Sequence, residues 1–281
     1  MKKIRHAAWA GHFYPGKPDA LRSMITGYLE KAPASDPVRP LFGLIVPHAG
    51  YVYSGATAAI GYAQVADLPV ETVVVVAPCH SAFFPGVSVF DGDVYETPLG
   101  GIEIDLERSR QLAVLSPLLR LSSDGHSVSG EDAEHALEVQ LPFLQTVLKR
   151  PFKLVAAVFH DYSWPICQAL GDGLAAVADD KTLIIASTDL YHGYSYAECL
   201  EADQKTLQGI LSGDAEHFCH GYAVRQYEAC GAGPVAALLQ AAAHKNRPEI
   251  KLLHHTTSAD VTGKRGGYVV GYASVAVGEK Q

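Results

Sequence analysis

Residues 72 to 80 form the sequence TVVVVAPCH, an almost uninterrupted apolar run that ends in a histidine. A continuous rather than alternating apolar run is typical of a strand buried on both faces of a parallel sheet. Residues 182–187 (TLIIAS) show the same pattern. Segments of helical periodicity lie between such runs, and this alternation indicates βαβ units. The sequence therefore predicts an α/β fold with a mainly parallel or mixed central sheet and helices on both faces.

The predicted elements alternate along the whole chain. Strands are expected at 41–46, 72–77, 86–90, 152–159, 182–187, 250–256 and 268–277. Helices are expected at 18–30, 55–65, 106–114, 134–148, 165–178, 196–211 and 233–244. Residues 91–101, rich in proline and glycine, indicate a hairpin or an extended connection. The sequence shows no internal repeat, low-complexity tract or block of charge, so we expect one domain over residues 1–281.

Composition excludes several classes of protein. The chain has 281 residues, is 48% hydrophobic and carries a formal net charge of −8. Nucleic acids and anionic membranes attract clustered lysine and arginine, so neither is expected as a partner. No segment approaches the roughly 20 apolar residues that span a bilayer, and no apolar stretch of signal-peptide length follows the basic start. Five scattered cysteines predict free thiols in a reduced, cytoplasmic protein.

Three histidines follow predicted strands. His48 ends the stretch 41–48, His80 ends 72–80, and His192 lies in the loop after the strand at 182–187. Ligands of open α/β sheets bind outside the carboxyl ends of the strands, so these side chains are expected to converge if the strands are neighbours. Taken singly, His48 is equally explained as a turn histidine bonded to the backbone. Together the three predict a metal or acid–base centre.

Other residues offer matching chemistry. Cys230 precedes an apolar helix, whose dipole is expected to lower the pKa of the thiol and suit it to metal binding or attack. The alternative is a buried structural cysteine. Asp189 and His192 share one loop and are expected to form a carboxylate–imidazole pair, unless Asp189 caps a helix near His192. His135 lies three residues before Glu138 on a predicted helix, where a solvated face is the default. Ser54 is expected to cap the helix after His48.

Five blocks of sequence, in the same order, resemble the Memo family, whose prokaryotic branch is called AmmeMemoRadiSam system protein B. The resemblance runs from about residue 10 to the C-terminus. The blocks are PHAGY at 47–51 with Ser54-Gly55, ETPLG at 96–100, HALEVQLPF at 135–143, STDLYH at 187–192 and TTSADVT at 256–262.

The resemblance implies a fold like the catalytic subunit of class III extradiol ring-cleaving dioxygenases, which are non-haem iron enzymes. It implies a metal centre formed by His48, His80 and Cys230, with His192, Asp189 and His135 in the same pocket. The family is linked to iron or copper and to redox chemistry, and the donor set also suits Zn²⁺. A radical-SAM protein and an AMMECR-type protein are the partners that the resemblance suggests.

Two departures affect the function. Cys79 stands before His80 where the family more usually has serine or asparagine, and the dioxygenases use a carboxylate where this chain has Cys230. A dioxygenase fold therefore does not establish dioxygenase activity.

Three functions are expected to compete. The first is a redox-active metal centre, an oxidoreductase if catalytic, in which His192 is the general acid/base and His135 stabilises an oxygen-bearing ligand. The second is a hydrolase or transferase with Cys230 as nucleophile and His192 as base. The third is a module that binds a peptide or small ligand without turnover, with an aromatic rim to the pocket. That rim would consist of Tyr14, Tyr51, Tyr53, Tyr191 and Tyr194.

Overall fold

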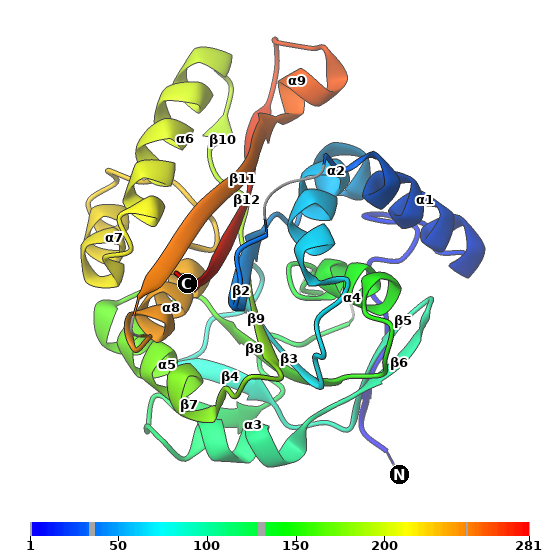
Figure 1. The fold of residues 1–281 in the computed structure, drawn as a ribbon, viewed down its shortest axis with the longest axis vertical. Helices are drawn as coiled ribbons and strands as arrows, with labels where there is room; N and C mark the ends of the chain where they lie inside the picture. Colours follow the sequence, from blue (N-terminus) through cyan, green and yellow to red (C-terminus); the bar gives the residue numbers. More distant parts are fainter. Residues whose placement is uncertain (1, 34–36, 129–132, 246, 281) are drawn as a thin grey trace.

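The computed structural model describes residues 2–33, 37–128, 133–245 and 247–280. A nine-stranded mixed sheet forms its centre (Figure 1), with strands in the order β10-β12-β2-β9-β3-β8-β4-β7 and β11 paired to β12. The strands are β2 (Leu41–Val46), β3 (Thr72–Pro78), β4 (Val87–Phe90), β7 (Leu119–Ser122), β8 (Lys153–Phe159), β9 (Thr182–Ser187), β10 (His192–Gly193), β11 (Pro248–Thr257) and β12 (Val269–Glu279). The four central strands, β2, β9, β3 and β8, are parallel, whereas β12 and β4 run antiparallel to them.

Helices pack on both faces of this sheet (Figure 1). One face is covered by α3 (Leu106–Ala113), α5 (Trp164–Val177), α7 (Ala215–Ala223) and α8 (Ala232–Ala243). The other is covered by α1 (Pro18–Lys31), α2 (Tyr51–Tyr62) with the 3₁₀ turn η1 (Ala63–Val65), and η3 (Glu138–Gln140) continuing into α4 (Leu141–Val147). The helix α6 (Tyr196–Leu211) packs on the β11–β12 hairpin, whose connection carries α9 (Ser258–Thr262). The predicted α/β class with helices on both faces is confirmed.

A second, smaller sheet lies beside the first. It has the order β1-β5-β6 and consists of β1 (Ile4–Arg5), β5 (Val94–Thr97) and β6 (Gly100–Glu103). The strands β5 and β6 are antiparallel neighbours, so the hairpin predicted within residues 91–101 is confirmed. The short strands β1, β7 and β10 were not predicted.

The central strands position the site. Val73, Val74, Val75 and Val76 have no exposed surface, which accounts for their unbroken apolar pattern. Because β2, β9 and β3 are parallel neighbours, their carboxyl ends lie at one edge of the sheet. The chain segments that follow them are therefore brought together.

The helices differ from prediction in two boundaries and in two helices that were not predicted. The helix α2 begins at Tyr51 with Gly50 as its N-cap, so Ser54 lies in its first turn rather than at its cap. The Ser54 hydroxyl donates to the Ala49 carbonyl oxygen at 2.9 Å, and its predicted capping role is wrong. Within the predicted helix 134–148 only residues 138–147 are helical, and α7 and α9 were not predicted. None of the helices in the described ranges is long and apolar enough to cross a membrane.

Candidate metal centre

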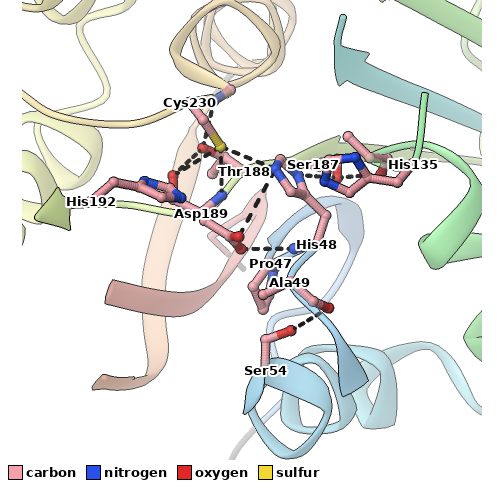
Figure 2. Close-up of polar contacts among 12 residues, drawn as sticks. Pro47, His48, Ala49, Ser54, His135, Ser187, Thr188, Asp189, His192 and Cys230 are labelled. Atoms are coloured by element: carbon pink, nitrogen blue, oxygen red, sulfur yellow. Dashed lines mark hydrogen bonds and ion pairs between the residues drawn. The ribbon is translucent and has the colours of Figure 1, made fainter. Parts of the chain in front are cut away.

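Three metal-capable side chains converge at the carboxyl edge of the sheet. His48 follows β2, His80 follows β3, and Cys230 precedes α8. One ring nitrogen of each histidine and the sulfur of Cys230 lie within 4.8 Å of one another. Figure 2 shows Cys230 and His48 facing each other, with Asp189 between their backbones. The resemblance implied that these three residues lie together, and the structure brings them together; that they bind a metal stays a prediction.

The His48 ring is buried and its protonation is fixed by Ser187, the last residue of β9. His48 Nδ1 lies 2.9 Å from Ser187 Oγ, and the Ser187 hydroxyl donates to the Ala136 carbonyl oxygen at 2.7 Å. Because that hydroxyl proton is used, Nδ1 must donate, and Nε2 keeps its lone pair. Nε2 lies 3.0 Å from Cys230 Sγ. Burial, and then the nearby His80, lower the pKa of His48 well below its usual value, so the ring is neutral.

His80 is held by a carboxylate that the sequence analysis did not single out, Glu134. His80 Nδ1 lies 3.1 Å from Glu134 Oε1, and the His80 backbone N–H donates to Oε2. Glu134 Oε1 also accepts backbone N–H bonds from His135 at 2.7 Å and Ala136 at 2.8 Å. Nδ1 is thereby occupied and His80 Nε2 is left for a ligand. The sequence feature that could have indicated Glu134 is its position directly before His135, a candidate site residue.

The electrostatics of this pair follow from burial and contact. Burial raises the pKa of Glu134, but the hydrogen bond and charge of His80 outweigh it and hold that pKa at about 2. Burial lowers the pKa of His80, yet the hydrogen bond and charge of Glu134 leave it above the usual value. Glu134 is therefore ionised at neutral pH and orients His80.

Cys230 is bound on both sides by Asp189. The Cys230 N–H donates to the Asp189 carbonyl oxygen at 3.2 Å, and the Asp189 N–H donates to Cys230 Sγ at 3.2 Å. Burial, and then the Asp189 carboxylate, raise the pKa of the thiol far above its usual value. The expectation that the α8 dipole lowers this pKa is therefore wrong for the metal-free protein, because desolvation of the thiolate dominates.

Asp189 and His192 do not form the predicted pair. Asp189 Oδ1 accepts the His48 backbone N–H at 2.8 Å, and Oδ2 lies 4.0 Å from His48 Nε2. His192 is exposed, and its Nδ1 lies 2.9 Å from the Leu190 carbonyl oxygen, which accepts only. The His192 tautomer is therefore set by Leu190, which leaves Nε2 free. Nor does Asp189 cap a helix, because α6 begins at Tyr196 after Ser195.

His135 forms a wall of the site. Its ring centroid lies 4.4 Å from that of Phe13, 4.9 Å from His80 and 5.5 Å from His48. Burial, and then His48, lower the pKa of His135 to about 3. The predicted solvated helix face is wrong: His135 precedes the helix and Glu138 is fully buried against Arg5. His135, Glu134 and His80 also bring ligand atoms within 4.8 Å of one another, although the Glu134 oxygens are already occupied by four N–H groups.

A pocket of about 590 Å³ opens beside the thiol and includes Cys230 and His192 among its lining residues. The five tyrosines of the predicted aromatic rim differ in exposure. Tyr53 and Tyr194 are exposed, whereas the other three tyrosines, Tyr14, Tyr51 and Tyr191, are buried. Cys79, which precedes His80, is buried.

Comparisons with known proteins agree on one family. The family model for Memo-like protein matches residues 5–276. A MEMO1 family protein of Nitrosopumilus maritimus is 31% identical over 97% of this chain and 98% of its own length. MEMO1 family proteins of Methanocaldococcus jannaschii and Methanothermobacter thermautotrophicus are each 35% identical, over 99% and 97% of this chain and 100% of their own lengths.

A solved structure shares the fold. The crystal structure of an uncharacterised protein from Escherichia coli K12 superposes with a TM-score of 0.56 at 15% identity. The match covers 85% of this chain and 100% of that one. At this identity the likeness concerns the fold alone.

Proposed function

Because this chain belongs to the Memo-like protein family, we propose that it binds one redox-active metal ion, iron or copper, through His48, His80 and Cys230. The observation that carries the proposal is the convergence of their three ligand atoms within 4.8 Å. In both histidines the other ring nitrogen already has a hydrogen-bond partner, as is usual for histidines that bind metals.

The donor set fits such an ion. Two neutral imidazoles and one thiolate suit iron, copper and Zn²⁺, and three protein ligands leave a coordination position open. Cys230 must lose its proton to bind, so binding is expected to release a proton into a site where the thiol is otherwise neutral. When bound, the ion would supply Lewis-acid or one-electron chemistry.

The surrounding residues have separate tasks. We assign His192 as the group that moves a proton at Nε2, because this atom is free and the residue lines the pocket next to Cys230. His135, kept neutral by burial, can hold an oxygen-bearing ligand. The resulting activity would be that of an oxidoreductase acting on a small organic molecule. Association with radical-SAM and AMMECR-type proteins remains a prediction from the resemblance.

A second candidate is a thiol nucleophile, which one observation favours. His48 Nε2 lies 3.0 Å from Cys230 Sγ, so His48, rather than the predicted His192, is placed to act as the base. However, burial raises the pKa of the thiol and lowers that of the imidazole, so the neutral pair is favoured over the thiolate–imidazolium pair. This candidate predicts full activity without metal and rapid alkylation near neutral pH.

Metal content tests the proposal directly. Protein purified anaerobically without added metal or chelator should hold nearly stoichiometric iron or copper by elemental analysis. Cys230→Ser should lose most of that metal, because it removes one of three ligands, and Cys199→Ser should retain it as the matched control, since Cys199 Sγ faces Asp203 at 3.5 Å. Metal-free wild-type protein with a fast-reacting Cys230 would contradict the metal centre and support the nucleophile.

A further inference from the structure

The pocket beside the candidate metal centre contains an arginine to which no task has yet been assigned. Arg225 lines the same space of about 590 Å³ as Cys230 and His192. We infer that Arg225 binds the carboxylate of a small organic acid and thereby orients the acid toward the metal. This inference rests on the proposed metal site. The Arg225 guanidinium is the one permanent cation among the described residues that line this pocket.

Arg225 occupies an unusual backbone position. It follows α7 with φ at +59°, the one non-glycine residue with positive φ in the described ranges. Its N–H donates to the Tyr222 carbonyl at 2.9 Å and the next N–H, of Gln226, donates to the Gly221 carbonyl at 2.8 Å. These two bonds form the Schellman motif that ends many helices, in which glycine normally takes the left-handed position. Here that position carries a long cationic side chain in a conformation that favours glycine.

The guanidinium is available to a ligand. In the part of the chain that the structure describes, it takes part in none of the side-chain hydrogen bonds or ion pairs. Arg225 also lines a second pocket, of about 500 Å³, in which two other lining residues are already occupied: Lys205 Nζ pairs with Glu201 at 2.7 Å, and His217 Nε2 contacts the Tyr227 hydroxyl at 3.1 Å. An arginine fork matches a carboxylate with two parallel hydrogen bonds.

Glu228 also lines this pocket and carries a negative charge. It repels any anionic ligand, and this repulsion increases with the charge of the ligand. A carboxylate carries a single charge and matches the guanidinium with two parallel hydrogen bonds, so the ligand class we propose is a carboxylic acid.

The test compares 3,4-dihydroxybenzoate with 3,4-dihydroxybenzamide, which differ only in the carboxylate. Their dissociation constants are measured by calorimetry on metal-loaded and on metal-free protein. Wild type should prefer the acid by about tenfold or more, in line with a charge-assisted pair. Arg225→Gly should remove the preference without lowering the melting temperature, because glycine suits the left-handed position. Arg225→Lys should restore part of the preference.

Controls separate this inference from the metal site. Arg150→Gly, a matched change at an exposed arginine that lines a different pocket, should keep the preference for the acid. Equal binding of acid and amide by wild type, or an unchanged preference in Arg225→Gly, would overturn the inference. So would displacement of the acid by inorganic phosphate at equal concentration. Because Arg225 is not a metal ligand, the preference should survive in metal-free protein. Failure to bind metal would therefore contradict the proposed function and the orientation toward the metal, but not the carboxylate site at Arg225.

Discussion

The chemistry of the site depends on which nitrogen of each histidine carries a proton. Ser187 Oγ donates to Ala136 and accepts from Gln140 Nε2 at 2.7 Å, so its bonding capacity is used when His48 Nδ1 also donates to it. Gln140 in turn donates to the Pro47 carbonyl at 2.9 Å. These bonds hold the His48 ring before any ligand arrives, which lowers the ordering cost of binding.

Glu134 is expected to support metal affinity without touching the metal. Glu134→Gln removes the negative charge opposite His80 Nδ1 and replaces a strong acceptor with a weaker one. We expect the dissociation constant for the metal to rise by roughly 10- to 100-fold, the usual effect of losing such a partner. Competition against a chelator of known affinity measures the change.

The matched control for this prediction is Glu107→Gln, an exposed glutamate in the first turn of α3. It should leave metal affinity unchanged. If Glu134→Gln binds as tightly as the control, Glu134 serves only to fold the loop around His135 and Ala136, whose N–H groups it also accepts.

The sequence predicted the candidate metal ligands better than the residues that hold those ligands by hydrogen bonds. His48 and His80 were recognisable because each lies just beyond the end of a strand, and parallel strands bring such positions to one edge. Glu134 was not, because its role depends on how close the segment before η3 comes to the end of β3, which periodicity does not encode. The pKa of Cys230 was wrongly predicted because the burial of the thiol is a tertiary property that outweighs the helix dipole.

At the scale of elements, the site depends on the close approach of the start of α8 to the end of β9. Gly231 is the N-cap of α8, and its N–H donates to Thr188 Oγ1 at 2.9 Å. A Cβ at this position would lie 2.1 Å from the Ser187 carbonyl oxygen and 2.8 Å from Thr188 Cβ. The absent side chain therefore lets Cys230 reach the metal-binding edge.

Two glycine substitutions are expected to act in opposite directions. Gly231→Ala should destabilise the protein by about 1–3 kcal/mol, as overpacking does, and should weaken metal binding because α8 must move away from β9. Gly27 lies in α1, where a Cβ would meet no atom within 4 Å. Gly27→Ala should therefore stabilise the folded protein by about 0.5–1 kcal/mol. Urea unfolding and metal titration of both variants measure these changes. Unaltered metal affinity in Gly231→Ala would show that Cys230 does not depend on this contact.

Element types were predictable where the apolar pattern was long. The long apolar runs predicted β3 and β9, and helical periodicity predicted α6. A strand of two residues, such as β1, is too short to show a recognisable pattern. The predicted helix 134–148 began too early, because Pro142 sits in the first turn of α4, a position that proline favours, and the α-helix begins only at Leu141.

At the scale of the whole molecule, the site is assembled from distant parts of the chain. Buried Arg5 on β1 pairs with Glu138 of η3, which also accepts the backbone N–H groups of Ala8 and Trp9 at 2.9 Å each. This network fixes the N-terminal segment so that Phe13 packs against His135. The sequence predicted the sheet that carries the strand-end ligands, but a buried ion pair between residues 133 positions apart has no local signature.

Buried neutral histidines make the stability of the whole molecule depend on pH. His126 is buried and is not one of the candidate ligands, with the Tyr95 hydroxyl donating to Nδ1 at 2.8 Å. Its Nε2 faces the Ser88 carbonyl oxygen at 3.4 Å. Burial lowers the pKa of His126 to about 3. An unfolded histidine gains a proton below about pH 6.5, so the unfolded state binds more protons between these values.

Stability should therefore fall as pH falls below about 6.5, by up to about 1.4 kcal/mol per pH unit for this one histidine. Depressed carboxyl pKa values, such as that of Glu134, add to the loss at lower pH, because the unfolded carboxyl gains a proton at a pH where the folded one is still ionised.

The free energy of unfolding of metal-free protein is measured in urea at about pH 7 and about pH 5. The difference between the two values should be roughly 2 kcal/mol smaller in His126→Gln than in wild type. The control His220→Gln, exposed on α7, should keep the wild-type difference. An equal pH dependence in His126→Gln and wild type would show that His126 gains its proton without unfolding, and the acid sensitivity would then belong to the histidines and carboxylates at the strand ends.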